Sequence, residues 1–270
     1  MRKILVFQNL KLSFETDNPK KFLKSQWQKE DKSTTFVIYR ILIAIFFIFS
    51  YTNGLVVSAT GNQILLSFIY LTRLNMLATA ITCTIGAYYA VSFYFEKINP
   101  QNRMTLGIKF YWFMYNNIVP FSCAVSLVYW ILLYGTDKDD TINLNNVLMH
   151  MTNSLVLLID LIIVHHEHRI LHFVYLLVCG TGYLAFTLIY TFLGGVNTKG
   201  QNYVYSVLDW KENPKKAVIV TFGVYFLLIV LHMIVCGIAK LKQMVHDCIL
   251  VTSKNESELQ VVHVNIMNPV

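Results

Sequence analysis

The chain has 270 residues, of which 55% are hydrophobic and only 14% are charged, and its formal net charge is +7. A soluble domain carries about 25% charged residues, so this composition excludes a water-soluble globule. An aromatic content of 14%, with 5 prolines and 5 cysteines, also excludes a disordered chain and a small domain held by disulfides. An integral membrane protein remains. We expect its basic residues to face anionic lipid, and no nucleic acid to bind.

Six apolar runs follow one another, and each exceeds the ~20 residues that a helix needs to cross a bilayer. Together they hold 142 of the 270 residues. They do not alternate as membrane barrel strands do, and a helix satisfies its own backbone groups in lipid. We therefore predict an all-α polytopic transmembrane bundle of six helices. The expected spans are residues 36–57, 64–89, 108–134, 144–164, 171–193 and 217–239.

The distribution of lysine and arginine predicts the orientation. If the N-terminus is cytosolic, the cytosolic segments carry 14 basic residues and the outer loops carry 5. Cytosolic loops of membrane proteins are enriched in these residues, so we expect both termini in the cytosol, although four of the outer five lie in the loop before the last span. The predicted organisation is a basic cytosolic segment (1–35), a transmembrane domain (36–239) and a cytosolic tail (240–270). The expected location is the plasma membrane or the endoplasmic reticulum.

Polar residues within the spans are costly and need a reason. The second span carries a polar stripe at helical spacing, and the fourth span carries a second, shorter one. Such stripes commonly pack membrane helices together, and they also occur at functional sites. The first stripe comprises Thr72, Asn75, Thr79, Cys83 and Gly86, and the second comprises His150, Asn153 and Ser154, with Asp160 to one side.

Thr72 and His150 are expected at similar depths. If the second span is one continuous helix from residue 64, Thr72 lies ~12 Å from its outer end, and His150 lies ~9 Å from the outer end of the fourth span. A hydroxyl facing an imidazole is the arrangement of a nucleophile and its general base. Asn75, Asn153 or Ser154 would then be candidates to stabilise an oxyanion.

Arg73 lies about 100° around the helix from Thr72. Three roles are open for this cation. It can extend to the membrane surface, form an ion pair with Asp160, or bind the carboxylate of a lipid.

Four histidines cluster between the fourth and fifth spans, namely His165, His166, His168 and His172. Their spacing would suit a metal site on a helix, but the segment is short and interrupted by Arg169. We predict a loop of interfacial histidines without a metal. No cofactor is expected, because the sequence has no glycine-rich phosphate loop, zinc-type cysteine pairs or dinucleotide fingerprint.

Short strings in a fixed order, from about residue 25 to residue 220, resemble the rolling stone family of animal membrane proteins. The most specific are the His150…Asn153-Ser154 element and the Leu208-Asp209-Trp210 element. The others are Ser25-Gln26-Trp27, Tyr39-Arg40, Tyr70-Leu71-Thr72, Tyr111-Trp112, Tyr183…Phe186…Ile189-Tyr190, Gly194-Gly195 and Tyr205-Ser206-Val207.

That family is distantly similar to the androgen-induced and androgen-dependent-TFPI-regulating proteins. Those are six-span enzymes that hydrolyse fatty acid esters of hydroxy fatty acids with a membrane threonine and histidine. Leu71-Thr72 matches their Leu-Thr and Met149-His150 matches their Met-His, so the resemblance implies catalytic roles for Thr72 and His150. An aromatic residue usually follows the threonine in that family, whereas Arg73 stands here.

Two functional hypotheses follow. The first is an intramembrane hydrolase of a lipid ester, in which Thr72 attacks the ester and His150 takes its proton. The second is a non-catalytic membrane protein acting in cell–cell fusion of the myoblast type or in adhesion, in which the polar stripes only pack helices. Membrane lipids are the expected partners in both.

Overall fold

The computed structural model describes residues 11–98, 100, 103–135, 142 and 144–267, with the backbone alone from 253 onward. Six helical segments are long and apolar enough to cross a membrane, and the described residues contain no β-strand. The predicted all-α bundle of six spans is thus confirmed. Its main helices are α2 (Thr34–Thr60), α4 (Leu71–Tyr94), α5 (Leu106–Val128), α7 (Asn153–Ile163), α8 (Phe173–Phe192) and α9 (Pro214–Met267). The shorter ones are η1 (Pro19–Leu23), α3 (Ile64–Ser67), η2 (Tyr129–Leu133), α6 (Leu144–Val147), η3 (Leu148–Thr152), η4 (Ile170–His172) and η5 (Ser206–Leu208). The fourth span is the longer helical segment Leu144–Ile163, of which α7 is the last part.

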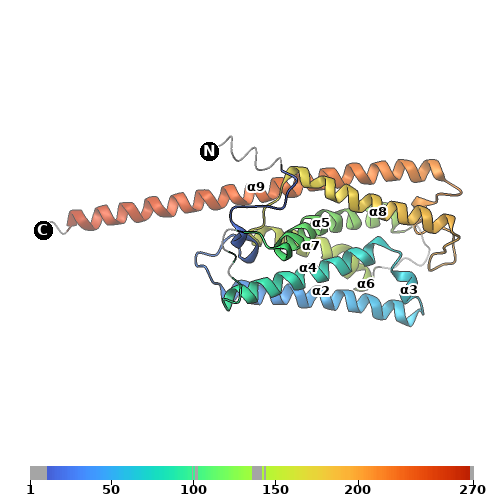
Figure 1. Cartoon of the computed structure of the whole chain (residues 1–270), viewed down its shortest axis with the longest axis horizontal. Coiled ribbons are helices and arrows are strands. Elements are labelled where there is room, and N and C mark those ends of the chain that lie inside the picture. Colours follow the sequence, from blue (N-terminus) through green and yellow to red (C-terminus); the bar gives the residue numbers. More distant parts are fainter. Residues whose placement is uncertain (1–10, 99, 101–102, 136–141, 143, 268–270) are drawn as a thin grey trace.

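The helices form layers around α5. Figure 1 shows α2 and α4 along one side, α5 and α7 in the middle, and α8 and α9 along the other side. We call the end with the N-terminal segment and the end of α7 the terminal end, and the end with α3 the cavity end. Helix α9 has 54 residues, or ~80 Å at 1.5 Å per residue. It therefore continues well beyond the bundle at the terminal end (Figure 1).

The second span differs from its prediction. Instead of one helix from residue 64, the short helix α3 is followed by a break, and α4 begins at Leu71. The break is stabilised from outside the span, because the phenol oxygens of Tyr183 and Tyr205 both accept the Leu71 N–H, at 3.1 and 3.0 Å. Thr72 is therefore the second residue of α4. The prediction that Thr72 lies ~12 Å from the outer end of a continuous helix is wrong.

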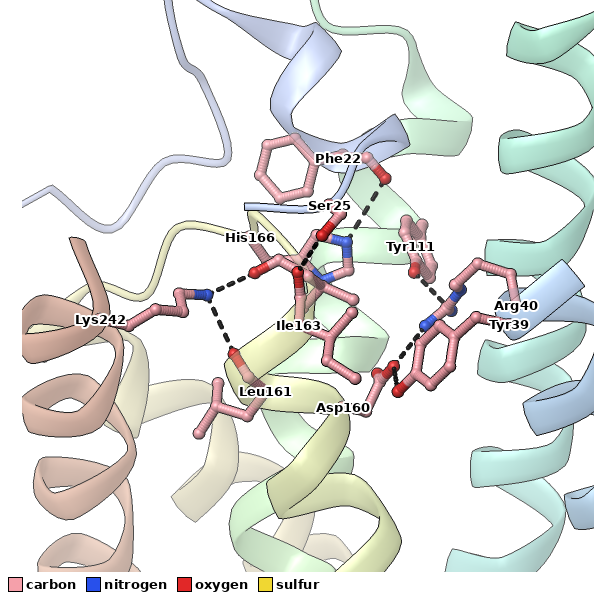
Figure 2. A network of polar contacts seen from close by, with 11 residues as sticks. Phe22, Ser25, Tyr39, Arg40, Tyr111, Asp160, Leu161, Ile163, His166 and Lys242 are labelled. Atoms are coloured by element: carbon pink, nitrogen blue, oxygen red, sulfur yellow. Dashed lines mark hydrogen bonds and ion pairs between the residues drawn. The ribbon is translucent and has the colours of Figure 1, made fainter. Parts of the chain in front are cut away.

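The N-terminal segment packs against the terminal end of the bundle. Its backbone runs beside the end of α7, where the Gln26 N–H and the Ser25 hydroxyl both donate to the Ile163 carbonyl at 2.9 Å. Lys242 of α9 donates to the carbonyls of Leu161 and Val164 (Figure 2). The last carbonyls of a helix have no partner within it. These contacts supply such partners, and so the described part of the basic segment, residues 11–35, belongs to the folded structure.

A buried ion pair lies near these contacts at the terminal end. The Arg40 guanidinium donates to the Asp160 carboxylate at 2.8 Å, and the two side chains are 1% and 0% exposed. Tyr39 donates to the same oxygen of Asp160, and Arg40 also donates to the Tyr111 hydroxyl at 2.9 Å (Figure 2). A Cβ atom at Gly86 would lie 1.8 Å from Arg40 Nη2. The pair thus joins α2, α5 and α7, and it needs a glycine on α4.

Removing one member of this pair should destabilise the protein strongly. Asp160→Leu leaves Arg40 buried without its counter-ion, which typically costs about 3–5 kcal/mol. The double variant Arg40→Met with Asp160→Leu removes both charges and should recover most of that loss. The free energy of unfolding, measured by denaturant titration in detergent micelles, tests both expectations.

The control is Lys32→Gln, which breaks the exposed ion pair between Lys32 and Glu96 at the same end. Exposed pairs contribute little to stability, so this variant should unfold like the wild type. An Asp160→Leu protein as stable as the wild type would show that the buried pair does not hold the helices together.

Candidate functional site

A cavity of about 530 Å³ opens at the cavity end. Its walls come from the end of α2, the start of α4, the segment of η2, α6 and η3, and the loop between α8 and α9. Thr72, Arg73 and His150 all line it. The structure therefore brings together the three residues that the sequence singled out, from two helices that are far apart in the chain.

Thr72 lies in the first turn of α4. The amides of a first helical turn have no carbonyl partner within the helix, and the partial positive charge at a helix N-terminus favours a developing anion. Tyr205 hydrogen-bonds with the Thr72 side chain, and burial raises the pKa of Tyr205, so its phenol stays protonated at neutral pH. A hydroxyl and a phenol thus meet at one point of the cavity wall. The Leu71 amide of this turn already donates to two phenols, and the Arg73 and Leu74 amides donate to the Tyr70 carbonyl.

His150 lies in the π-helical turn η3, a local geometry that is frequent at functional sites. Its ring stacks on Tyr129, with centroids 3.5 Å apart and planes at 4°. Its Nδ1 atom is buried and has no hydrogen-bond partner among the described residues. Stacking on an aromatic ring therefore holds the imidazole, and no carboxylate of the described residues bonds to its Nδ1 atom. Sequence reasoning did not find Tyr129, because that contact depends on where α5 meets η3.

Arg73 is 7% exposed and points back toward α2. Its Nη2 atom donates to the Gly54 carbonyl at 2.9 Å and to the Ser58 hydroxyl at 2.8 Å, while Nε and Nη1 have no partner among the described residues. A Cβ atom at Gly54 would lie 2.1 Å from Nη1. The predicted alternative of an ion pair between Arg73 and Asp160 is wrong, because Asp160 lies near the terminal end of α7 and Arg73 lies at the opposite end of the bundle.

The loop between α8 and α9 covers one side of the cavity. The Thr198 carbonyl accepts from Gln63 at 2.8 Å, and the Thr198 hydroxyl lies 2.9 Å from the Tyr70 hydroxyl. Before α9, Asp209 accepts the backbone N–H groups of the two residues that follow Trp210. Trp210 itself donates to the Thr187 hydroxyl of α8 at 3.2 Å. The Leu-Asp-Trp element thus shapes and anchors the loop.

The expected oxyanion donors do not reach the cavity wall. Asn75 donates to Ser122 at 2.8 Å, and Ser154 accepts from Ser126 at 2.9 Å. Asn153 is 1% exposed within the bundle, with neither amide atom paired among the described residues. Asn75 and Ser154 thus bond to α5 side chains within the bundle, whereas the break before α4 places Thr72 at its end.

Three histidines of the cluster, His165, His166 and His168, lie in a loop, as expected, whereas His172 lies in the short helix η4. Residues 165–169 have no helical structure. His166 forms a hydrogen bond with the Phe22 carbonyl at 3.4 Å, and His168 forms one with the Asn116 side chain at 3.1 Å. Burial holds the pKa of both rings well below the ordinary histidine value. Within the described part of the chain, no three metal-ligating side chains are grouped as a metal site requires.

An apolar cleft of about 90 Å³ adjoins the polar cavity. It runs between α5, α8 and α9, and its wall is made of aliphatic and aromatic side chains. Four residues border both spaces, namely Thr72, Tyr129, Leu133 and Tyr205. Thr72 thus lies at the boundary between a polar and an apolar space.

Cysteine labelling tests this arrangement. In a variant without the native cysteines, a cysteine replacing Thr72 or His150 should react rapidly with a charged maleimide in detergent, because both positions line the polar cavity. A cysteine replacing Asn75 or Asn153 should react only after unfolding, since both side chains are buried. Equal reaction rates at all four positions would contradict the cavity. The rates are measured by mass spectrometry.

Comparisons with known proteins agree with the resemblance of the sequence. A family model described as "Protein rolling stone" matches residues 4–257. Protein rolling stone of Drosophila melanogaster is 30% identical over 233 residues, which cover 83% of this chain and 83% of the fly protein. No solved structure matches significantly. Together with its six apolar helices, these matches show that the chain is a multi-pass integral membrane protein and belongs to the rolling stone family.

Proposed function

We propose that this protein is an intramembrane hydrolase of lipid esters, with Thr72 as the nucleophile and His150 as the general base. The observation that carries the proposal is the position of Thr72. It shares a polar cavity with His150 and also borders an apolar cleft. An ester bond between a polar and an apolar group would lie at that boundary.

In the proposed reaction, Thr72 Oγ1 attacks the ester carbonyl carbon while His150 accepts the hydroxyl proton. The carbonyl oxygen becomes an oxyanion, which the Tyr205 phenol and the positive end of the α4 helix dipole stabilise. The alcohol then leaves with the proton from His150, and an acyl-threonine remains. Water, deprotonated by His150, attacks this ester and releases the acid and the free Thr72 hydroxyl.

Arg73 supports a substrate with a free carboxylate. None of the ion pairs in the described part of the chain includes Arg73, and two of its buried donor atoms are unpaired. A buried charge without a counter-ion is costly. A carboxylate in the cavity would supply that counter-ion and would leave the ester of a hydroxy fatty acid near Thr72. This is the class of substrate that the distant resemblance implies.

The orientation is also proposed. With both termini in the cytosol, the cavity opens on the outer side of the plasma membrane or the luminal side of the endoplasmic reticulum, as the basic residues predict. In intact cells that display the protein on their surface, an impermeant maleimide should label the Thr72→Cys variant. Labelling only after permeabilisation would reverse the assignment.

Thr72→Ala should abolish hydrolysis of a fatty acid ester of a hydroxy fatty acid while folding is preserved. One membrane hydrogen bond is worth only ~0.6 kcal/mol on average, whereas loss of a nucleophile costs several orders of magnitude in rate. His150→Ala should have the same effect, and the double variant should be little worse, because the two residues act together. Release of fatty acid and Thr72-dependent labelling by a fluorophosphonate probe are the measurements.

The matched control is Thr79→Ala, which removes the same atoms from the same helix away from the cavity. The Thr79 hydroxyl donates to the Asn75 carbonyl, and its loss should leave the rate unchanged. Arg73→Gln should raise KM for the free acid far more than for its methyl ester. If the wild-type protein hydrolyses no lipid ester, or Thr72→Ala remains fully active, the hydrolase is excluded and the non-catalytic role in fusion or adhesion remains.

A further inference from the structure

The apolar cleft beside Thr72 is not explained by the reaction at the polar cavity. Its walls on α5 and α9 belong to a small apolar cluster that is separate from the main core around α4. On α5 the wall includes Phe121, on α8 Gly180, and on α9 Tyr225 and Leu228. A space between packed helices has room for an occupant, whereas protein interiors otherwise close-pack.

The cleft extends deep into the bundle from Thr72. Gly180 lies twelve residues before the last residue of α8, and Leu228 lies fourteen after the first residue of α9. At 1.5 Å per residue these positions are about 18 and 21 Å from the cavity end. The cleft is thus long and, at about 90 Å³, much smaller than the polar cavity of about 530 Å³. Its shape suits an extended hydrocarbon chain, and a polar head group fits only the larger space.

We infer that this cleft binds the acyl chain of the lipid and that Gly180 sets how long a chain it accepts. The inference rests on the proposed function for the position of the ester, which would lie at Thr72 with its chain running between α5, α8 and α9. In the cleft, the apolar surface of the acyl chain is buried away from the polar cavity. This burial is non-directional and requires no hydrogen bond to the chain.

Gly180 faces three other residues of the cleft wall. A Cβ atom there would lie 3.5 Å from Tyr225 Cε1, 3.7 Å from Leu228 Cδ1 and 4.0 Å from Phe121 Cζ. These are ordinary van der Waals distances, so alanine fits without distortion. A leucine side chain would extend further, between residues that all line the cleft, and would block its deep part. Gly182, two residues along α8, has no atom within 4 Å of its Cβ position among the described residues and provides a matched control.

The first measurement compares hydrolysis of p-nitrophenyl palmitate with that of p-nitrophenyl butyrate. In Gly180→Leu, the ratio of kcat/KM for palmitate to that for butyrate should fall about tenfold or more, because one misplaced methylene in an apolar pocket already has an effect of that size. Gly182→Leu should keep the wild-type ratio. Gly180→Ala, whose methyl group fits, should shift the ratio in the same direction by less and serves if the leucine variant does not fold.

The second measurement does not depend on hydrolysis. Thr72→Ala protein is irradiated with palmitic acid that carries a diazirine near its methyl end, and the adducts are mapped by mass spectrometry. Adducts should fall on Phe121, Tyr225 or Leu228 and disappear when Gly180→Leu is added. Adducts in the cleft without any hydrolysis by the wild type would support the chain site and refute the hydrolase. Hydrolysis with an unchanged substrate ratio in Gly180→Leu, or adducts only on the lipid-facing surface, would overturn the chain site and leave the hydrolase standing.

Discussion

The cost of placing charge inside a membrane constrains this structure more than any other factor. A charged group in the hydrocarbon core must be paired or hydrogen-bonded, and Arg40 is both, through Asp160 and Tyr111. Because those partners lie on α7 and α5, satisfying one cation fixes the relative positions of three helices. A bulky residue at Gly86 on α4 would push the guanidinium away. Pairing thus determines both which helices meet and where a glycine is required.

The two long antiparallel helices α2 and α4 have a similar arrangement at their other end, where an arginine again packs against a glycine. Arg40 of α2 lies against Gly86 of α4, and Arg73 of α4 lies against Gly54 of α2. The first arginine has a carboxylate partner, and the second has only a carbonyl and a hydroxyl. The same packing therefore gives a closed structural pair at the terminal end. At the cavity end, the same packing leaves the cation of Arg73 with unpaired donors. The terminal end thus holds the helices together, and the cavity end suits a ligand.

The candidate site could be foreseen only in part. Thr72 and His150 share a cavity, but not for the reason that their spacing suggested, since the second span breaks before Thr72. Asn75 and Ser154 follow the same stripes and bond to α5 side chains instead, and Asn153 is buried within the bundle. Helical periodicity identifies which residues share a face, but it does not identify the neighbour of that face. The sequence offered Arg73 as a partner of Asp160, but the partner is Arg40, which lies near the same end of the bundle.

The sequence by itself determined the class of the protein, the number of spans and the family. Hydrophobicity over ~20 residues is a local property, and in lipid it admits only a helix because backbone groups must be satisfied within the segment. Tertiary structure decided the rest. The break before α4 needs the phenols of Tyr183 and Tyr205, the orientation of His150 needs Tyr129, and the cavity needs the loop after α8. These contacts join residues far apart in the chain, and only the packing of the helices brings them together.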